Sequence, residues 1–257
     1  MVSYLAVLGA ALTGAFLSFF CGFGLGTILL PAFASCYALP LAVASTSAVH
    51  LANNGFKLLL VGKYAHWPTV WRFGLWSFVG ATLGALLLVY IADSMVLHSW
   101  VAWGHVFEIT PIKLVMAVMM IGFAIFEWYQ SGNEVLVPPG ILPYGGIISG
   151  FFGGLSGHQG ALRSAFLMRS GLTKEQFLGT RVMIACLVDI PRLGIYAYAF
   201  RDAWSGVEKQ WLLLTILAAF AGAWLGNRLV KKMTLHSIQR VVGIALILFG
   251  LMLAAGF

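Results

Sequence analysis

The chain has 257 residues, of which 61% are hydrophobic and only 9% are charged. Ordinary soluble domains are about half apolar and about a quarter charged, so a soluble core of this length could not bury so much apolar surface. The composition therefore predicts an integral membrane protein whose main partner is the lipid bilayer. The formal net charge of +7 includes no basic run and no basic patch interleaved with aromatic residues, so we expect no nucleic-acid binding.

Windows of about 20 apolar residues predict ten segments along the chain. No acidic or basic residue precedes Lys57, so the first window lacks the basic start of a cleaved signal peptide and is expected to be the first span. The expected segments are 4–20, 27–43, 44–62, 73–92, 111–130, 141–157, 159–171, 177–199, 210–228 and 237–256.

Two of these segments are poor candidates for a complete crossing. Residues 159–171 are too few and too basic to cross hydrocarbon alone, and 27–43 is interrupted by glycines, Pro31 and Pro40. Irregular backbone at membrane depth must be buried in protein, so both segments are predicted to be broken or half-spanning helices.

The two halves of the chain match one another in order, which predicts an internal repeat. Residues 20–26 align with 152–160 when one insertion is allowed, and residues 54–57 align with 189–192. Because five segments is an odd number, the second half must be inverted in the membrane relative to the first. We therefore predict an all-α, polytopic membrane protein: a single transmembrane domain over 1–257, with a first repeat, 1–134, and a second repeat, 135–257.

The basic loops predict the orientation of the chain. Lys63 and Arg72 follow the third segment, and the basic residues of 228–232 follow the ninth, whereas the loops at 93–113 and 201–209 mix both signs of charge. With ten crossings both basic loops lie on one side, which the positive-inside rule assigns to the cytoplasm. Both termini are then expected outside.

Ionisable and strongly polar side chains inside apolar segments are costly, so they are the first functional candidates. In the third segment, spacings of three and four residues place His50, Asn53, Asn54 and Lys57 largely on one helical face. We expect Asn53, Asn54 and Lys57 to bind substrate. The alternative is that such side chains tie helices together or, at Lys57, reach toward the membrane surface.

The equivalent segment of the second half contains Arg181, Asp189 and Arg192. Asp189 and Arg192 are three residues apart on a helix and can form an ion pair. We expect these three residues to gate the transport path or to couple it to protons. A purely structural tie is again the alternative, above all for Arg192.

Glycine-rich breaks at 22–27 and 153–160 each precede a short stretch that can form a helix. A helix that begins inside the membrane directs free N–H groups and a partial positive charge at whatever lies there, so two such starts could form an anion site. Close helix packing is the alternative role for the glycines. The expected donors to an oxyanion are Thr27, Ser156, His158, Gln159 and Arg163.

At these motifs the chain resembles the sulfite exporter TauE/SafE family, a group of bacterial, archaeal and plant membrane proteins. Residues 22–31 are similar to the family's clustered glycines followed by an apolar run and a proline. Residues 157–164 depart from that pattern, because His158 and Gln159 replace glycines and Arg163-Ser164 stand where proline is expected, which indicates a variant branch.

This resemblance implies export of sulfite, or of a small organosulfonate such as sulfoacetate, by alternating access across the bacterial plasma (inner) membrane. Coupling to the proton gradient would need a titratable group in the path, for which Asp189 and His158 are the candidates.

A secondary transporter of a small anion is the leading hypothesis, and a passive anion channel is the first alternative because the same polar groups could line a pore. A metal-ion permease using His50, His158 and Asp189 is less favoured, since the chain has only 8 acidic residues. A membrane-embedded enzyme would need a nucleophile with its base, paired carboxylates or a metal cluster. We therefore expect a non-enzyme without metal or cofactor, and small-residue stripes at 78–84 and 220–226 favour a homodimer.

Overall fold

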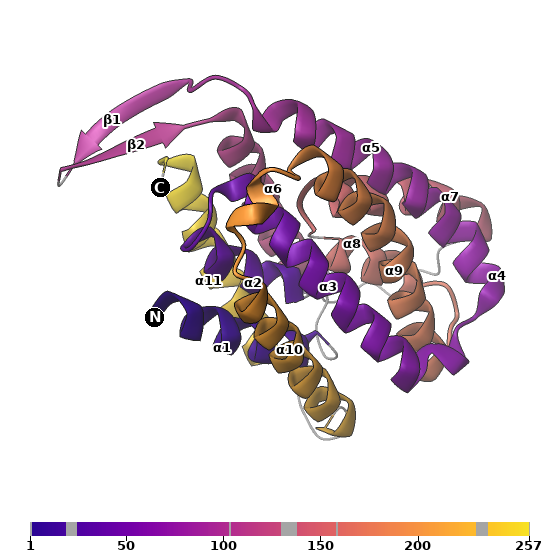
Figure 1. The fold of residues 1–257 in the computed structure, drawn as a ribbon. Helices are drawn as coiled ribbons and strands as arrows, with labels where there is room; N and C mark the ends of the chain where they lie inside the picture. Colours follow the sequence, from indigo (N-terminus) through magenta and orange to yellow (C-terminus); the bar gives the residue numbers. More distant parts are fainter. Residues whose placement is uncertain are drawn as a thin grey trace.

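A computed structural model describes residues 2–18, 25–102, 104–129, 138–157, 159–229 and 236–256. Gly22, Gly24 and His158 of the two glycine-rich motifs, together with Lys231 and Lys232, lie outside the described residues. Figure 1 shows one bundle of helices with the N- and C-terminal ends on the same side of the view. The helices are α1 (Val2–Leu17), α2 (Leu25–Ala34), α3 (Leu39–Val61), α4 (Trp67–Thr69), α5 (Leu75–Ala92), α6 (Pro111–Tyr129), α7 (Leu142–Ser156), α8 (Gly160–Met168), α9 (Lys174–Ala199), α10 (Lys209–Leu229) and α11 (His236–Ala254).

The predicted all-α polytopic class is confirmed. Among the described residues, three continuous helical stretches are long and apolar enough to cross a membrane: Trp67–Ala92, Lys174–Ala199 and Lys209–Leu229. The first of them joins α4 to α5 through one π-helical turn, Val70–Gly74. Large apolar side chains cover the outward faces, with Leu83 53% exposed and Tyr90 81% exposed on α5. Such faces are stable in lipid and would be a liability in water.

The two segments predicted to span only half the membrane are short helices. α2 has 10 residues and α8 has 9, so each is about 14 to 15 Å long, half of a hydrocarbon core about 30 Å thick. The predicted boundary between residues 43 and 44 is wrong, because α3 already begins at Leu39. Pro40 lies in the first turn of α3, where a missing N–H costs nothing, and Pro31 lies inside α2.

The predicted repeat assigns each helix of the first half a corresponding helix in the second half, and the contacts between helices follow this correspondence. α1 packs along α10 and α7 packs along α5; α1 corresponds to α7 in the predicted repeat, and α10 corresponds to α5. α3 packs against α9, and α6 against α11, which are also corresponding helices. The contacts therefore follow the order of the predicted repeat, and its inversion in the membrane stays a prediction. The division at residue 134 falls outside the described residues and stays a prediction.

The predicted small-residue stripes pack inside the chain. A Cβ atom added at Gly84 of α5 would lie 2.0 Å from the carbonyl oxygen of Phe151 in α7, and one added at Gly222 of α10 would lie 2.1 Å from that of Leu12 in α1. These glycines therefore let the backbones of paired helices touch. Because that packing is within the chain, the stripes do not bear on the homodimer, which stays a prediction.

The stretch expected to be a loop between α5 and α6 contains a β-hairpin of strands β1 (His98–Ala102) and β2 (His105–Ile109). Trp100 stacks on its cross-strand partner Phe107 and donates from Nε1 to the carbonyl oxygen of Ala255, 2.7 Å away. Gly104 at the turn has a φ of 77°, which favours glycine. Hydrogen bonds from Trp100 to Ala255 and from Glu108 to Gly256 therefore join the hairpin to the residues that follow α11.

Candidate functional site

A polar cavity lies between α3, α8 and α9, where α1 and α7 end. It contains about 400 Å³ of empty space, including the part open to solvent. The residues that line it are Ser18, His50, Asn54, Lys57, Gly157, Gln159, Gly160, Arg163, Arg181, Val182 and Ala185.

Helical spacing explains how α3 and α8 present their polar groups to this cavity. His50, Asn54 and Lys57 are separated by four and three residues, so they follow one face of α3. Gln159 immediately precedes α8 and lies one turn before Arg163. The walls that α3 and α8 contribute are therefore polar helix faces, whereas α9 contributes Arg181 together with the apolar Val182 and Ala185.

The break between α7 and α8 depends on Gly157. This residue ends α7 with a left-handed φ of 80°, and a Cβ atom there would lie 2.6 Å from Nη1 of Arg192. Glycine avoids both the backbone strain and the collision. α8 then starts at Gly160 against the cavity, so the partial positive charge at its N-terminus faces that space.

Three cationic side chains line the cavity and are almost fully buried: Lys57 is 4% exposed, Arg163 5% and Arg181 8%. Lys57 donates from Nζ to Oγ of Ser18, and Arg181 donates from Nη2 to the carbonyl oxygen of the same residue. Arg163 donates from Nη1 to Oε1 of Gln159 over 2.9 Å. No acidic side chain is among the lining residues that the structure describes, so the wall has a strong excess of positive charge.

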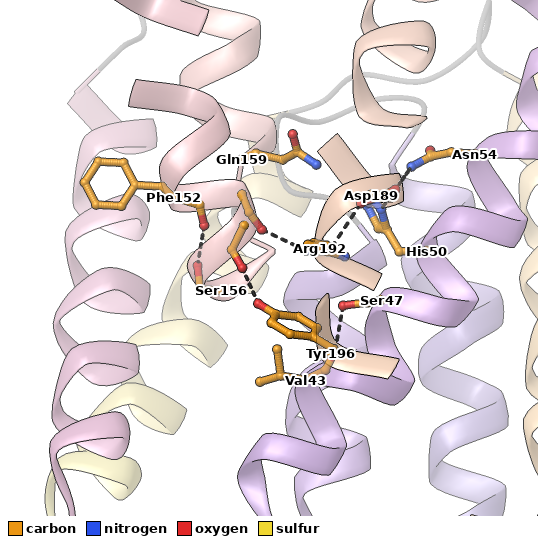
Figure 2. Close-up of polar contacts among 12 residues, drawn as sticks. Val43, Ser47, His50, Asn54, Phe152, Ser156, Gln159, Asp189, Arg192 and Tyr196 are labelled. Atoms are coloured by element: carbon orange, nitrogen blue, oxygen red, sulfur yellow. Dashed lines mark hydrogen bonds and ion pairs between the residues drawn. The ribbon is translucent and has the colours of Figure 1, made fainter. Parts of the chain in front are cut away.

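Two donor atoms in this wall have no hydrogen-bond partner in the described part of the chain. They are Nε2 of Gln159, a residue only 1% exposed, and Nε of Arg163. Buried polar atoms nearly always find a partner, so two orphaned donors beside a polar cavity point to acceptors supplied by a ligand or by water. Figure 2 shows the amide of Gln159 directed toward the side on which Asn54 and Asp189 lie.

Asp189 of α9 lies behind the cavity and links α3 to α9. Its Oδ2 atom lies 2.6 Å from Nδ1 of His50 and accepts from Nδ2 of Asn54 at 2.7 Å. Its Oδ1 atom lies 3.2 Å from Nε of Arg192, close enough for an ion pair although not aligned as a hydrogen bond. Figure 2 shows His50 and Asn54 reaching from α3 to this carboxylate. The two halves of the chain thus meet at one buried carboxylate.

Arg192 and Tyr196 extend the same face of α9 to the end of α7. Arg192 donates from Nη1 to the carbonyl oxygen of Gly153 over 2.9 Å, and the hydroxyl of Tyr196 donates to that of Gly154. The carbonyl oxygen of Gly153 also accepts from the backbone N–H of Gly157, 2.8 Å away, so Arg192 adds a second donor there. The last carbonyls of a helix lack the usual partner within it, and the Tyr196 hydroxyl supplies a donor to that of Gly154.

The structure brings together half of the predicted site residues that it describes. Asn54, Lys57, Gln159, Arg163 and Arg181 all line the cavity. Sequence reasoning did not assign Ser18 or His50 to the substrate site. His50 shares a helical face with Asn54 and Lys57, which was the available signal, whereas nothing local marks Ser18, because its partners lie 39 and 163 residues away.

The other predicted residues lie close to the cavity but outside its lining. The side-chain hydroxyl of Ser156 donates to the carbonyl oxygen of Phe152 in its own helix, 3.0 Å away. The neighbours of Asn53 favour the orientation in which its amide nitrogen donates to the carbonyl oxygen of Ala219 and its oxygen accepts from Lys57, both at 3.2 Å. The remaining residues of this group are Thr27, which is buried in α2, and Asp189 and Arg192, described above.

Comparison with known proteins gave one match. The sequence model of the family described as Sulfite exporter TauE/SafE matches residues 6–253, which include every residue that lines the cavity. No curated protein and no solved structure matches the chain.

Proposed function

Because the chain belongs to the sulfite exporter TauE/SafE family, a family of membrane transporters and not of enzymes, we propose that it exports a small anion by alternating access. The proposed substrate is sulfite or a small organosulfonate such as sulfoacetate. One observation carries the proposal: three buried cations line a polar cavity that has no acidic side chain among its described lining residues.

Charge balance supports an anion as the substrate. A buried cation in a membrane protein is costly unless an opposite charge or a polar network compensates it. Among the described residues the carboxylate beside the cavity is Asp189, which is already paired with Arg192, so its single negative charge leaves most of the charge of Lys57, Arg163 and Arg181 uncompensated. An anion in the cavity would supply that compensation, and the start of α8 would add to the attraction.

The distribution of donors favours an oxyanion. Lys57 and Asn54 approach from α3, Gln159 and Arg163 from the start of α8, and Arg181 from α9. An anion with several oxygens presents acceptors in several directions and can therefore engage donors from more than one wall. In this proposal Thr27, Asn53, Ser156 and His158 support or extend the site from its edges.

Movement of α9 relative to α3 and α7 is the step we propose for alternating access. Asp189 joins α9 to α3, and Arg192 joins it to α7, so this pair would act as the gate and must rearrange when the cavity opens to the other side. We further propose that both termini face the outside of the bacterial plasma (inner) membrane, where the positive-inside rule places them.

Flux into proteoliposomes tests this function. Uptake of labelled sulfite and of labelled sulfoacetate would be measured with the wild type, Lys57→Ala, Arg163→Ala and His158→Ala, and with Arg201→Ala as a control. The Arg201 side chain is 74% exposed and lies away from the cavity, so the control should keep its flux. We expect the wild type to show saturable uptake, and Lys57→Ala and Arg163→Ala to reduce that uptake at least tenfold.

Two other outcomes would count against the proposal. Flux that does not saturate and shows no acceleration by unlabelled anion on the far side would indicate a passive channel. If the purified protein were folded but carried neither solute, sulfite and sulfoacetate would be ruled out as its substrates.

A further inference from the structure

We propose that His50 is a proton-binding site, and that its protonation and the binding of the anion strengthen one another. The proposal rests on the proposed function for the identity of the anion. It goes beyond that function because it assigns the proton to a residue of α3 that forms part of the cavity wall.

The hydrogen bonds around His50 fix which ring nitrogen faces which group. Asp189 accepts at Oδ2 from Nδ2 of Asn54, and its Oδ1 atom lies beside the guanidinium of Arg192, so it is held as a carboxylate. Nδ1 of His50, 2.6 Å from the same Oδ2 atom, must therefore donate and carry a hydrogen. Nδ2 of Asn54 is also 2.9 Å from this nitrogen, but a nitrogen that donates has no lone pair left to accept from it.

Nε2 is then the nitrogen that remains for the cavity. His50 lines the cavity while Nδ1 is turned to Asp189, so Nε2 can accept a proton there without any break in the bond to the carboxylate. A carboxylate that orients one nitrogen of an imidazole also stabilises the imidazolium form. Protonation adds one positive charge, with an N–H donor, to the wall that already contains Lys57 and Arg163.

The other charged groups near His50 are less suited to take up a proton. Within the described residues these are Lys57 on its own helix, Arg163 on α8, and Arg181, Cys186, Asp189 and Arg192 on α9. The arginines remain charged in almost every protein environment, and Asp189 is held as a carboxylate by His50, Asn54 and the ion pair with Arg192. Lys57 donates to Ser18, and Cys186 is a buried thiol on the face of α9 one turn before Asp189.

Linkage makes the proposal quantitative. If the anion binds more tightly when His50 is protonated, then bound anion must increase the proton affinity of His50 by the same factor. Anion binding should therefore take up as much as about one proton per site, and the anion affinity should fall by up to about tenfold for each pH unit over the range in which His50 loses its proton.

Calorimetry of sulfoacetate binding would measure this proton. Sulfoacetate has no group that titrates near neutral pH, so any proton taken up from buffers of different ionisation enthalpy belongs to the protein. The proteins would be the wild type, His50→Gln, and two matched controls, His98→Gln on the exposed β-hairpin and Cys186→Ala. We expect the wild type and both controls to take up the proton, and His50→Gln to bind more weakly and without proton uptake or pH dependence.

A second measurement uses the wild type alone and stays informative if His50→Gln fails to fold. Nitrogen NMR of selectively labelled histidine should show that, at high pH, the neutral His50 ring has its hydrogen on Nδ1, and that sulfoacetate shifts its titration to higher pH. A hydrogen on Nε2 in the neutral ring would overturn the inference.

The two proposals fail in different ways. Sulfoacetate binding without proton uptake, or with uptake that persists in His50→Gln, would overturn the role of His50 and leave anion transport standing. If neither sulfoacetate nor sulfite bound the wild type at any pH, the proposed function would fall and the coupling with it.

Discussion

Arg192 donates a hydrogen bond from Nη1 to the carbonyl oxygen of Gly153 over 2.9 Å, and so fixes α9 to the last turn of α7. The Nε atom of the same guanidinium lies 3.2 Å from Asp189, the carboxylate that holds His50 and Asn54 of α3. The Arg192 side chain, 1% exposed, thus donates to the end of α7 and also balances the charge of Asp189, the carboxylate that joins α9 to α3.

Arg192→Gln should destabilise the protein strongly, because it leaves Asp189 as an unbalanced buried charge. Breaking a buried ion pair typically costs about 3 to 5 kcal/mol, whereas an exposed pair contributes about 1 kcal/mol or less. Arg201→Gln is the matched control, since the Arg201–Asp202 pair is 74% and 97% exposed. Thermal unfolding in detergent should show a large loss for the first variant and almost none for the second; equal losses would contradict the role of Arg192.

Gly84→Ala should destabilise the bundle by forcing α5 away from α7. The added Cβ would meet the carbonyl oxygen of Phe151 at 2.0 Å, and overpacking of this kind costs about 1 to 3 kcal/mol. Gly122→Ala in α6 is the control, because no atom lies within 4 Å of the Cβ that it would add. The same unfolding assay should show the control unchanged or slightly stabilised, as alanine has the higher helix propensity. A tolerated Gly84→Ala would mean that these helices are not in backbone contact.

Gln159→Glu should abolish anion binding while leaving the fold intact. The new carboxylate would keep the place of Oε1 and pair with Arg163, so one of the three positive charges in the wall would be neutralised from within the protein. Gln176→Glu adds the same charge at the exposed N-terminal turn of α9 and should bind the anion normally. Sulfite-dependent thermal stabilisation is the readout, and retention of that stabilisation in Gln159→Glu would argue against this wall as the anion site.

Lys57→Met should weaken anion binding at least tenfold, because it removes a cation that is 4% exposed and whose field is little screened there. Lys63→Met, just beyond the end of α3, removes an exposed charge of the same sign and should change the affinity little. Binding isotherms at two ionic strengths would separate the two positions. If both variants lost the same affinity and salt removed both effects, the attraction would come from the surface of the protein and not from the cavity.

Most of the helices could be predicted from the sequence, because the length of an apolar run and the positions of glycine and proline are local signals. Half-length α2 and α8 were predictable from 27–43 and 159–171, where no continuous apolar run of full length exists. The position of Pro40 was misread, since a proline can begin a helix as well as interrupt one. The β-hairpin was missed because the hydrogen bond that joins it to the rest of the fold, from Trp100 to Ala255, links residues 155 apart in the sequence, which no local pattern reveals.

The site was partly predictable for a similar reason. Spacing within α3 and across the start of α8 placed Asn54, Lys57, Gln159 and Arg163 on shared faces, and these faces meet at the cavity. The approach of His50 to Asp189 was not predictable, because 139 residues separate them and only the packing of α3 on α9 joins them. The part played by Ser18 was not predictable either, because its hydroxyl and carbonyl oxygens accept from Lys57 and Arg181, which are distant in the sequence.

The short length of α8 determines where a bound anion would lie in the electric field of a membrane. This helix runs from Gly160 at the cavity to Met168, which is 70% exposed, and its length is about half the hydrocarbon thickness. A full crossing changes the energy of one elementary charge by about 2.3 kcal/mol per 100 mV, so an anion held at the start of α8 would feel about half of that amount. The membrane voltage would then change the energy of anion entry and the energy of anion release by similar amounts, each about half of the total for a full crossing.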